Sequence, residues 1–152
     1  MPVIDHNRIL KAMAPNAWDL SNKVLYDLCS MHPFHSEADA VLAKILMIGR
    51  VYAAAIERRK TKGDEEKNDN FYIDVVAPSL QNSDIDCWLA EAKAVQPGTT
   101  SAFFTLVKVH GLTTALFSEI SGMEKRSLAS KYLHFHVPKL FYIYDSDRKS
   151  VV

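Results

Sequence analysis

The residues best placed for chemistry follow a glycine near the end of the chain, in the stretch "EISGMEKRSLASKYLHFHVPKLFYIYD". Gly122 separates two helical patterns and suits the left-handed conformation that ends a helix. The next helix would begin near Glu124, and its first backbone amides, which lack partners, attract anions. Basic and hydroxyl side chains gather at the same place: Lys125, Arg126, Ser127 and Lys131. The sequence therefore predicts a phosphate site at this turn.

A carboxylate follows the same segment. Asp145 comes directly after the apolar run "FYIY". An ionised Asp at the mouth of a cleft can stabilise the positive charge that develops on a sugar as a glycosidic bond breaks, or orient an attacking water. An Asp in this position can also simply cap a following helix, which is the more ordinary role of such a residue. The residues alone leave both roles open.

Together, the turn, the amphipathic helix and the spaced Asp resemble the helix-hairpin-helix segment of the DNA glycosylase superfamily that includes the 8-oxoguanine glycosylases. Gly122 matches the first hairpin glycine, Met123 the apolar residue after it, and Pro138 the loop proline. Asp145 falls about where the catalytic Asp of the family falls. The match covers about a sixth of the chain, and its helical remainder is compatible with the family fold.

The resemblance implies a domain that binds double-stranded DNA, flips out a damaged base and excises it with Asp145, without a cofactor or a metal ion. It also implies that the chain is truncated, because family members continue with further helices after the catalytic Asp. The implied DNA contacts are Gly122, Met123, Lys125, Arg126, Ser127 and Lys131.

Two departures from the family pattern keep other functions open. Glu124 replaces the second hairpin glycine, and a carboxylate there opposes phosphate binding. Arg126 stands about where bifunctional members carry a nucleophilic Lys, and a guanidinium cannot form a Schiff base, although Lys125 is adjacent. With 18 basic and 18 acidic residues, the chain has no global attraction for nucleic acid. The alternatives are a non-catalytic helical DNA-binding module and a protein-interaction module of a bacterial defence or mobile element.

The spacing of apolar residues predicts an all-α domain with the hairpin near its C-terminal end. We expect helices from about Asn16 to Met31, from Ser36 as the cap to about Ile56, through Phe71 to an end near Pro78, and from Ser83 as the cap to Val95. Three more are expected from Ser101 to a stop at Gly111, from Leu112 to Ile120, and from Lys125 to Phe135.

The same spacing predicts which side of each helix faces the core. The expected inward residues are Leu20, Val24, Leu28 and Met31, then Val41, Ile45, Ile48, Tyr52 and Ile56, then Ile85, Trp88, Leu89 and Ala92. In the later helices they are Phe103, Val107 and His110, then Leu112, Leu116 and Ile120, and finally Leu128, Tyr132 and Phe135.

The chain of 152 residues predicts one domain, over residues 1–146, with residues 147–152 a disordered or non-native tail. Its two cysteines have no metal-ligand spacing and indicate a reduced, cytoplasmic protein. No apolar run reaches the length of a membrane span. The oligomeric state stays open.

Two polar segments have competing interpretations. The run Glu57 to Lys62, "ERRKTK", is either a solvated helix end or a contact to a phosphate backbone. His134 and His136 are too few to form a zinc site, and we expect His134 to pack beside Phe135 or to bond a backbone carbonyl.

Overall fold

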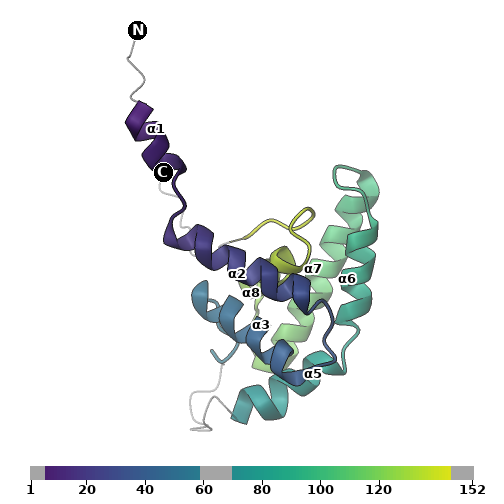
Figure 1. Ribbon diagram of the computed structural model, residues 1–152. Coiled ribbons are helices and arrows are strands. Elements are labelled where there is room, and N and C mark those ends of the chain that lie inside the picture. Colours follow the sequence, from purple (N-terminus) through teal and green to yellow (C-terminus); the bar gives the residue numbers. More distant parts are fainter. Residues whose placement is uncertain (1–5, 59–69, 145–152) are drawn as a thin grey trace.

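The described residues, 6–58 and 70–144 of this computed structural model, form helices and no strand (Figure 1). This confirms the all-α class. Residue 145 and the tail 147–152 lie outside the described residues, so the predictions made for Asp145 and for the tail are not addressed by the fold. In chain order the elements are α1 (His6–Met13), α2 (Ala17–Met31), α3 (Ala38–Val51), the π-helix η1 (Phe71–Val76), α5 (Ala77–Gln81), α6 (Ile85–Ala94), α7 (Thr100–Ser121) and α8 (Arg126–His136).

The core is built around α8, which packs against α2, α3 and α7. Its residues Leu128, Tyr132 and Phe135 are buried, as their spacing predicted. α3 supplies Val41 and Ile45, both fully buried. α6 packs along α7, while η1 and α5 cover α3. The turn that joins α7 to α8 is thus fixed on both sides by packed helices.

Local sequence signals explain where α2 and α7 begin. The side chain of Asn16 accepts hydrogen bonds from the amides of Trp18 (2.9 Å) and Asp19 (3.1 Å), and the Asp19 carboxylate accepts from the Asn16 amide (3.0 Å). This is a reciprocal capping box. At α7, the Thr99 hydroxyl accepts from the Ala102 amide (3.1 Å).

The prediction for α2 is correct in extent and wrong in orientation. Leu25 and Cys29 face the core, whereas Leu20 and Val24 keep 59% and 53% of their surface exposed. Leu28 is half-buried. α2 is apolar on two sides, and the side with the more regular spacing is the one left outside.

The two helices expected on either side of Gly111 are one continuous helix, α7. Gly111 lies in its interior, with open space around it, and packing of Val109 and Phe117 against the core outweighs the cost of about 1 kcal/mol for a helical glycine. Phe103 and Val107, expected inside, are exposed. Thr105 and Thr113 are buried instead.

Three further boundaries differ from the sequence prediction. α3 begins after Glu37, and Ser36 does not cap it. It ends at Val51, so Ile56 is buried in the segment that follows the helix. The helix expected to end near Pro78 continues to Gln81, because proline is tolerated in a first turn, where its missing N–H is not needed.

The sequence predicted the start of α6 to within one residue. The Ser83 hydroxyl accepts a long hydrogen bond (3.3 Å) from the Ile85 amide, although the capping position belongs to Asp84. Ile85, Leu89 and Ala92 face the core as predicted, and Trp88 packs against its edge.

Candidate functional site

The turn between α7 and α8 has the backbone conformation expected at its glycine. Gly122 ends α7 with φ = 69°, and its amide donates to the Ser118 carbonyl (2.8 Å). The Ser121 hydroxyl accepts from the Met123 amide (3.3 Å) and donates to the Phe117 carbonyl (2.7 Å). The left-handed glycine lets the chain leave α7 and enter α8 after only a few residues.

The first turn of α8 carries no side-chain cap. Its capping residue, Lys125, makes no capping bond, and the first bond into the helix joins the Ala129 amide to the Lys125 carbonyl (2.9 Å). The amides of Arg126, Ser127 and Leu128 precede that bond and have no acceptor within the helix. An uncapped helix start of this kind has a positive electrostatic potential.

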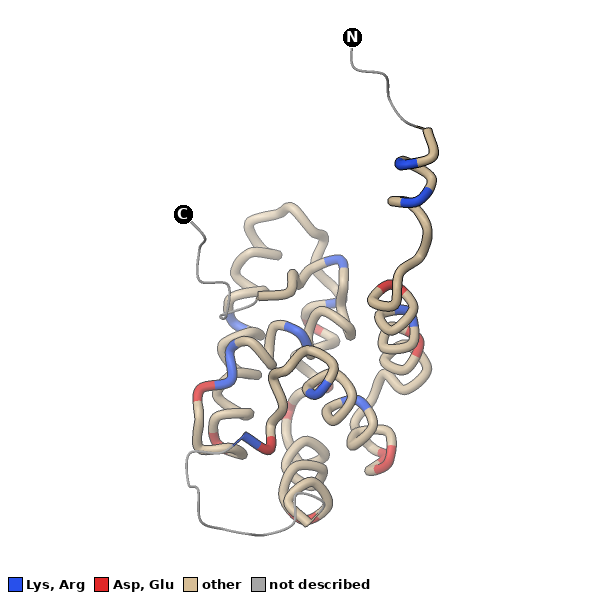
Figure 2. Tube along the Cα trace, turned by 90° about the vertical axis from the view of Figure 1, so that its left-hand side faces the viewer, with Lys and Arg blue, Asp and Glu red and all other residues tan. Residues whose placement is uncertain are grey.

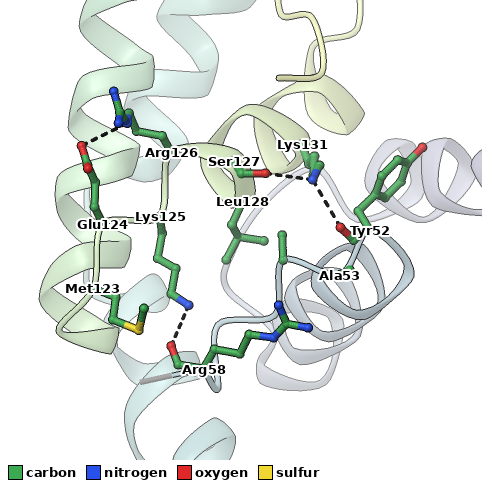
Figure 3. Close-up of a pocket in the computed structure, with 11 residues that line it drawn as sticks. Tyr52, Ala53, Arg58, Met123, Glu124, Lys125, Arg126, Ser127, Leu128 and Lys131 are labelled. Carbon is green, nitrogen blue, oxygen red and sulfur yellow. Dashed lines mark hydrogen bonds and ion pairs between the residues drawn. The ribbon is translucent and has the colours of Figure 1, made fainter. Parts of the chain in front are cut away.

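A hollow of about 270 Å³, which we call the hairpin pocket, lies at this helix start (Figure 3). One wall is the hairpin and the first turns of α8, and the other is the segment that follows α3. The lining residues are Tyr52, Ala53, Ala54, Arg58, Met123, Glu124, Lys125, Arg126, Ser127, Leu128 and Lys131.

Two of the predicted phosphate ligands use their ammonium groups on the protein itself. Lys125 Nζ donates to the carbonyls of Ala55 (3.1 Å) and Arg58 (2.6 Å). Lys131 Nζ donates to the Tyr52 carbonyl (3.3 Å) and to Ser127 Oγ (2.8 Å). Both lysines are buried, at 8% and 2% exposed. Burial, and then the neighbouring charge of Arg58, lowers the pKa of Lys125.

The arginines of the hairpin pocket are its exposed cations. Arg58 is exposed at the end of the α3 segment. Arg126 Nε lies 3.1 Å from Glu124 Oε1, and both side chains are more than half exposed. Glu124, the carboxylate that the sequence placed beside the predicted phosphate site, is therefore paired with Arg126, one of the predicted phosphate ligands (Figure 3).

The opposite wall of the pocket is fixed by the carboxylate of Glu57. Glu57 accepts from Arg50 Nε (3.1 Å) and from the Tyr72 hydroxyl. These bonds connect the end of α3 and its following segment to η1. Ala53, in the same wall, has φ = 53°, an uncommon conformation for a residue with a Cβ. The wall that carries Arg58 is thus fixed at several points.

A second set of hydrogen-bonded side chains, which the sequence did not reveal, joins the loop after α2 to α6 and α8. His35 Nδ1 donates to Asp86 Oδ1 (2.6 Å), and His35 Nε2 accepts from the Tyr132 hydroxyl (2.7 Å). His136 Nδ1 donates to the Tyr132 carbonyl (2.8 Å). Among the described residues, His136 Nε2 has no hydrogen-bond partner. Burial lowers the pKa of His35 to about 4 and that of His136 well below its ordinary value.

This network joins the loop after α2 to α6 and α8, and we interpret it as structural. His35 is 2% exposed and Tyr132 is fully buried, so no substrate reaches them. Lys44 completes the arrangement by donating to the carbonyls of His32 (2.8 Å) and Phe34 (3.0 Å). Burial lowers the pKa of Lys44 to about 8 and raises that of Cys29 to about 12.

His134 behaves as the sequence predicted. Its ring packs against Phe135 at 5.3 Å between centroids, and its Nδ1 donates to the Phe141 carbonyl (2.7 Å). Its Nε2 accepts from the Tyr26 hydroxyl (2.5 Å). Within residues 6–58 and 70–144, no group of three His, Cys, Asp or Glu is arranged to hold a metal ion. No helix in these ranges is long and apolar enough to cross a membrane.

The structure brings most of the predicted contact residues to one place: Met123, Lys125, Arg126, Ser127 and Lys131 all line the hairpin pocket. Arg58 lines the same pocket from the far side. It belongs to the run Glu57 to Lys62, for which the sequence left a phosphate contact and a solvated helix end open, and residues 59–62 of that run lie outside the described residues. Asp145 lies outside the described residues.

No family model matches the chain, and no curated protein or solved structure matches it.

Proposed function

We propose that the protein binds double-stranded DNA through its phosphate backbone at the hairpin pocket. The observation that carries this proposal is the uncapped start of α8 beside the exposed arginines Arg58 and Arg126. Backbone amides at a helix start and guanidinium groups are the usual ligands of a phosphate.

In the described part of the chain, the basic residues are spread over several elements and interspersed with acidic ones (Figure 2). With a net charge of zero, attraction to DNA has to come from a local site. Because phosphate contacts carry no sequence information, the proposed binding is insensitive to sequence and weakens as salt is added.

Excision of a flipped base by Asp145 is the second part of the proposal and rests on the resemblance to glycosylases. Three hydrogen bonds of a neighbouring residue support it. Tyr144, which precedes Asp145 in the sequence, has its amide bound to Ser130 Oγ (3.0 Å), and its carbonyl accepts from Ser130 Oγ (3.1 Å) and Ser127 Oγ (3.3 Å). Ser127 belongs to the first turn of α8. The last described residue before Asp145 is therefore bonded to the helix start that lines the hairpin pocket, and we propose that this helix start and Asp145 act on the same DNA.

The experiment is fluorescence anisotropy with a labelled duplex, over a range of salt concentrations. Replacing both Arg58 and Arg126 by Ala is expected to weaken binding equally for unrelated sequences. It is expected to reduce the slope of log K against log salt by about one phosphate contact, that of Arg58, because Arg126 is paired with Glu124 in the parent. The matched control replaces Lys108 and Lys139, two exposed lysines outside the pocket, and is expected to change little. Equal effects of both double variants would contradict the proposed site.

Excision needs its own test, a base-release assay on duplexes that each carry one damaged base. The parent protein is expected to release a base. Asp145→Asn is expected to lose this activity and to retain DNA binding, since that change keeps the shape of the side chain and removes its charge. DNA binding without base release would reduce the proposal to a non-catalytic DNA-binding module.

A protein-interaction module is the second candidate. The exposed apolar side chains on α2 and α7, including Val24, Met31 and Phe103, favour it. Salt-dependent binding to duplex DNA separates the two candidates, because a protein-interaction module is not expected to bind DNA at all.

A further inference from the structure

The outer face of α2 carries an apolar stripe that nothing in the described part of the chain covers. Leu20, Val24 and Met31 are 59%, 53% and 74% exposed, and half-buried Leu28 completes the stripe. Their spacing of three and four residues places them on one side of the helix. The core-facing side of the same helix, with Leu25 and Cys29, is separate and already buried.

A charged pair runs along one flank of this stripe. Lys23 Nζ lies 2.5 Å from Asp27 Oδ2, and both side chains are exposed, at 72% and 54%. The helical positions of 23 and 27 lie next to those of 20, 24 and 31, on the same flank. The α2 surface therefore combines an apolar centre with one basic and one acidic group at its edge.

From this arrangement we infer that two copies of the chain associate through α2, packed antiparallel about a two-fold axis. In an antiparallel pair of helices, like flanks meet, as they do in coiled coils. Lys23 then lies beside Asp27 of the second copy and Asp27 beside its Lys23. A parallel pair would bring this flank against the uncharged one, so that neither Lys23 nor Asp27 would meet an opposite charge of the second copy.

About the same two-fold axis, the apolar residues of one copy pack against apolar residues of the other. Val24 of each copy meets Leu28 of the other, and Leu20 meets Met31. An isologous interface needs this self-complementarity, because one surface has to serve as both partners. Exposed Phe34, just beyond the end of α2, lies where the start of the second copy's α2 would come. The α2 surface is thus complementary to itself in both its apolar and its charged groups, and for this reason we infer that its partner is a second copy of the chain.

The interface is small. α2 has 15 residues, which make a helix of about 22 Å. A single helix pair lies at the lower end of protein interfaces, so we expect a dissociation constant of about 10–100 µM rather than a permanent dimer.

Sedimentation equilibrium of the full chain, up to about 1 mM, tests the proposal around the expected dissociation constant. The parent is expected to change from monomer to dimer over this range. Val24→Lys is expected to weaken association at least about tenfold. Circular dichroism and urea unfolding confirm that the variant is folded, which is expected because Val24 is exposed.

Charge exchange tests the antiparallel arrangement. Lys23→Glu places like charges together across the two-fold axis and is expected to weaken association about fivefold, whereas the exchanged variant, Lys23→Glu with Asp27→Lys, is expected to restore it. Lys108→Glu breaks an exposed ion pair with Glu91 elsewhere and is expected to have no effect.

A parent that stays monomeric at about 1 mM overturns the proposal. So does a dimer that is unaffected by Val24→Lys. Weakening by Lys23→Glu without recovery in the exchanged variant overturns the antiparallel arrangement.

Discussion

Replacing Glu124 by Gln is the sharpest test of the hairpin pocket, because it removes one charge and keeps the size of the side chain. Glu124 Oε1 lies 3.1 Å from Arg126 Nε, and both side chains are exposed. An exposed ion pair is worth at most about 1 kcal/mol, so releasing Arg126 costs little. A carboxylate about 6 Å from a phosphate in water repels it by about 0.7 kcal/mol.

Both effects have the same direction. In Glu124→Gln, Arg126 is free to bind the phosphate and the repulsion is absent. Together they amount to about 1–1.5 kcal/mol, which is a gain in affinity of about five- to tenfold. The salt dependence should also become steeper by about one phosphate contact, because Arg126 would neutralise one more phosphate, which then releases its counterions.

The assay is anisotropy of a labelled duplex, titrated at several salt concentrations and repeated with a second, unrelated sequence. Glu37→Gln is the matched control. Its side chain is 67% exposed, and it lies at the opposite end of α3 from the pocket wall, about 20 Å away along the helix. The control makes the same change in net charge, so it separates a local effect from a global one.

Two results would refute the reasoning. If Glu124→Gln binds DNA no more tightly than the parent, Arg126 does not meet a phosphate. If Glu37→Gln gains as much as Glu124→Gln, the change in net charge accounts for the effect and the hairpin pocket does not.

Three further predictions concern the stability of the fold. His35 has a pKa of about 4 in the folded state against 6.5 unfolded, so its contribution is complete above about pH 6.5 and about 2 kcal/mol is lost by about pH 5. A flat profile of urea unfolding against pH would contradict this. Gly122→Ala should destabilise the fold by about 1–2 kcal/mol because residue 122 has a positive φ. Gly111→Ala should stabilise it by about 1 kcal/mol because Gly111 lies inside a helix. Equal midpoints of the two variants in thermal unfolding would refute this difference. Lys125→Met should cost about 1–3 kcal/mol by leaving two carbonyls without a donor, and a loss of DNA binding at unchanged stability would mean that Lys125 binds phosphate instead.

Helical periodicity predicted the parts of the fold in which one side of a helix is apolar. On α6, Ile85, Leu89 and Ala92 face the core as expected, and the same holds for Leu128 and Tyr132 on α8. The left-handed Gly122 between α7 and α8 was also predictable, because glycine adopts that conformation at little cost.

Periodicity failed where a helix is apolar on two sides. α2 presents Leu25 and Cys29 on one side and Leu20 and Val24 on another, and the pattern alone does not tell which side is buried. α7 has the same ambiguity, and its orientation is decided by packing against α6 and α8. Gly111 was taken for a stop because local propensity disfavours glycine in a helix, but tertiary packing overrides propensity.

The sequence predicted which residues line the hairpin pocket more accurately than it predicted which of their charges face solvent. Three buried lysines donate to carbonyls at or near helix ends: Lys44 to His32, the C-cap of α2, Lys131 to Tyr52, the C-cap of α3, and Lys125 to Ala55 in the segment after it. Helix ends leave such carbonyls unsatisfied, and their partial negative charge favours a cation.

A sequence does not distinguish a lysine used in this way from one that binds a ligand, so counting basic residues overestimates the charge offered to DNA. Among the residues that line the hairpin pocket, the exposed cations are Arg58 and Arg126. Since Glu124 pairs with Arg126, one acidic side chain determines how much of the remaining positive charge is available. The proposed affinity of the pocket for phosphate therefore depends on the residue that departs most clearly from the glycosylase hairpin.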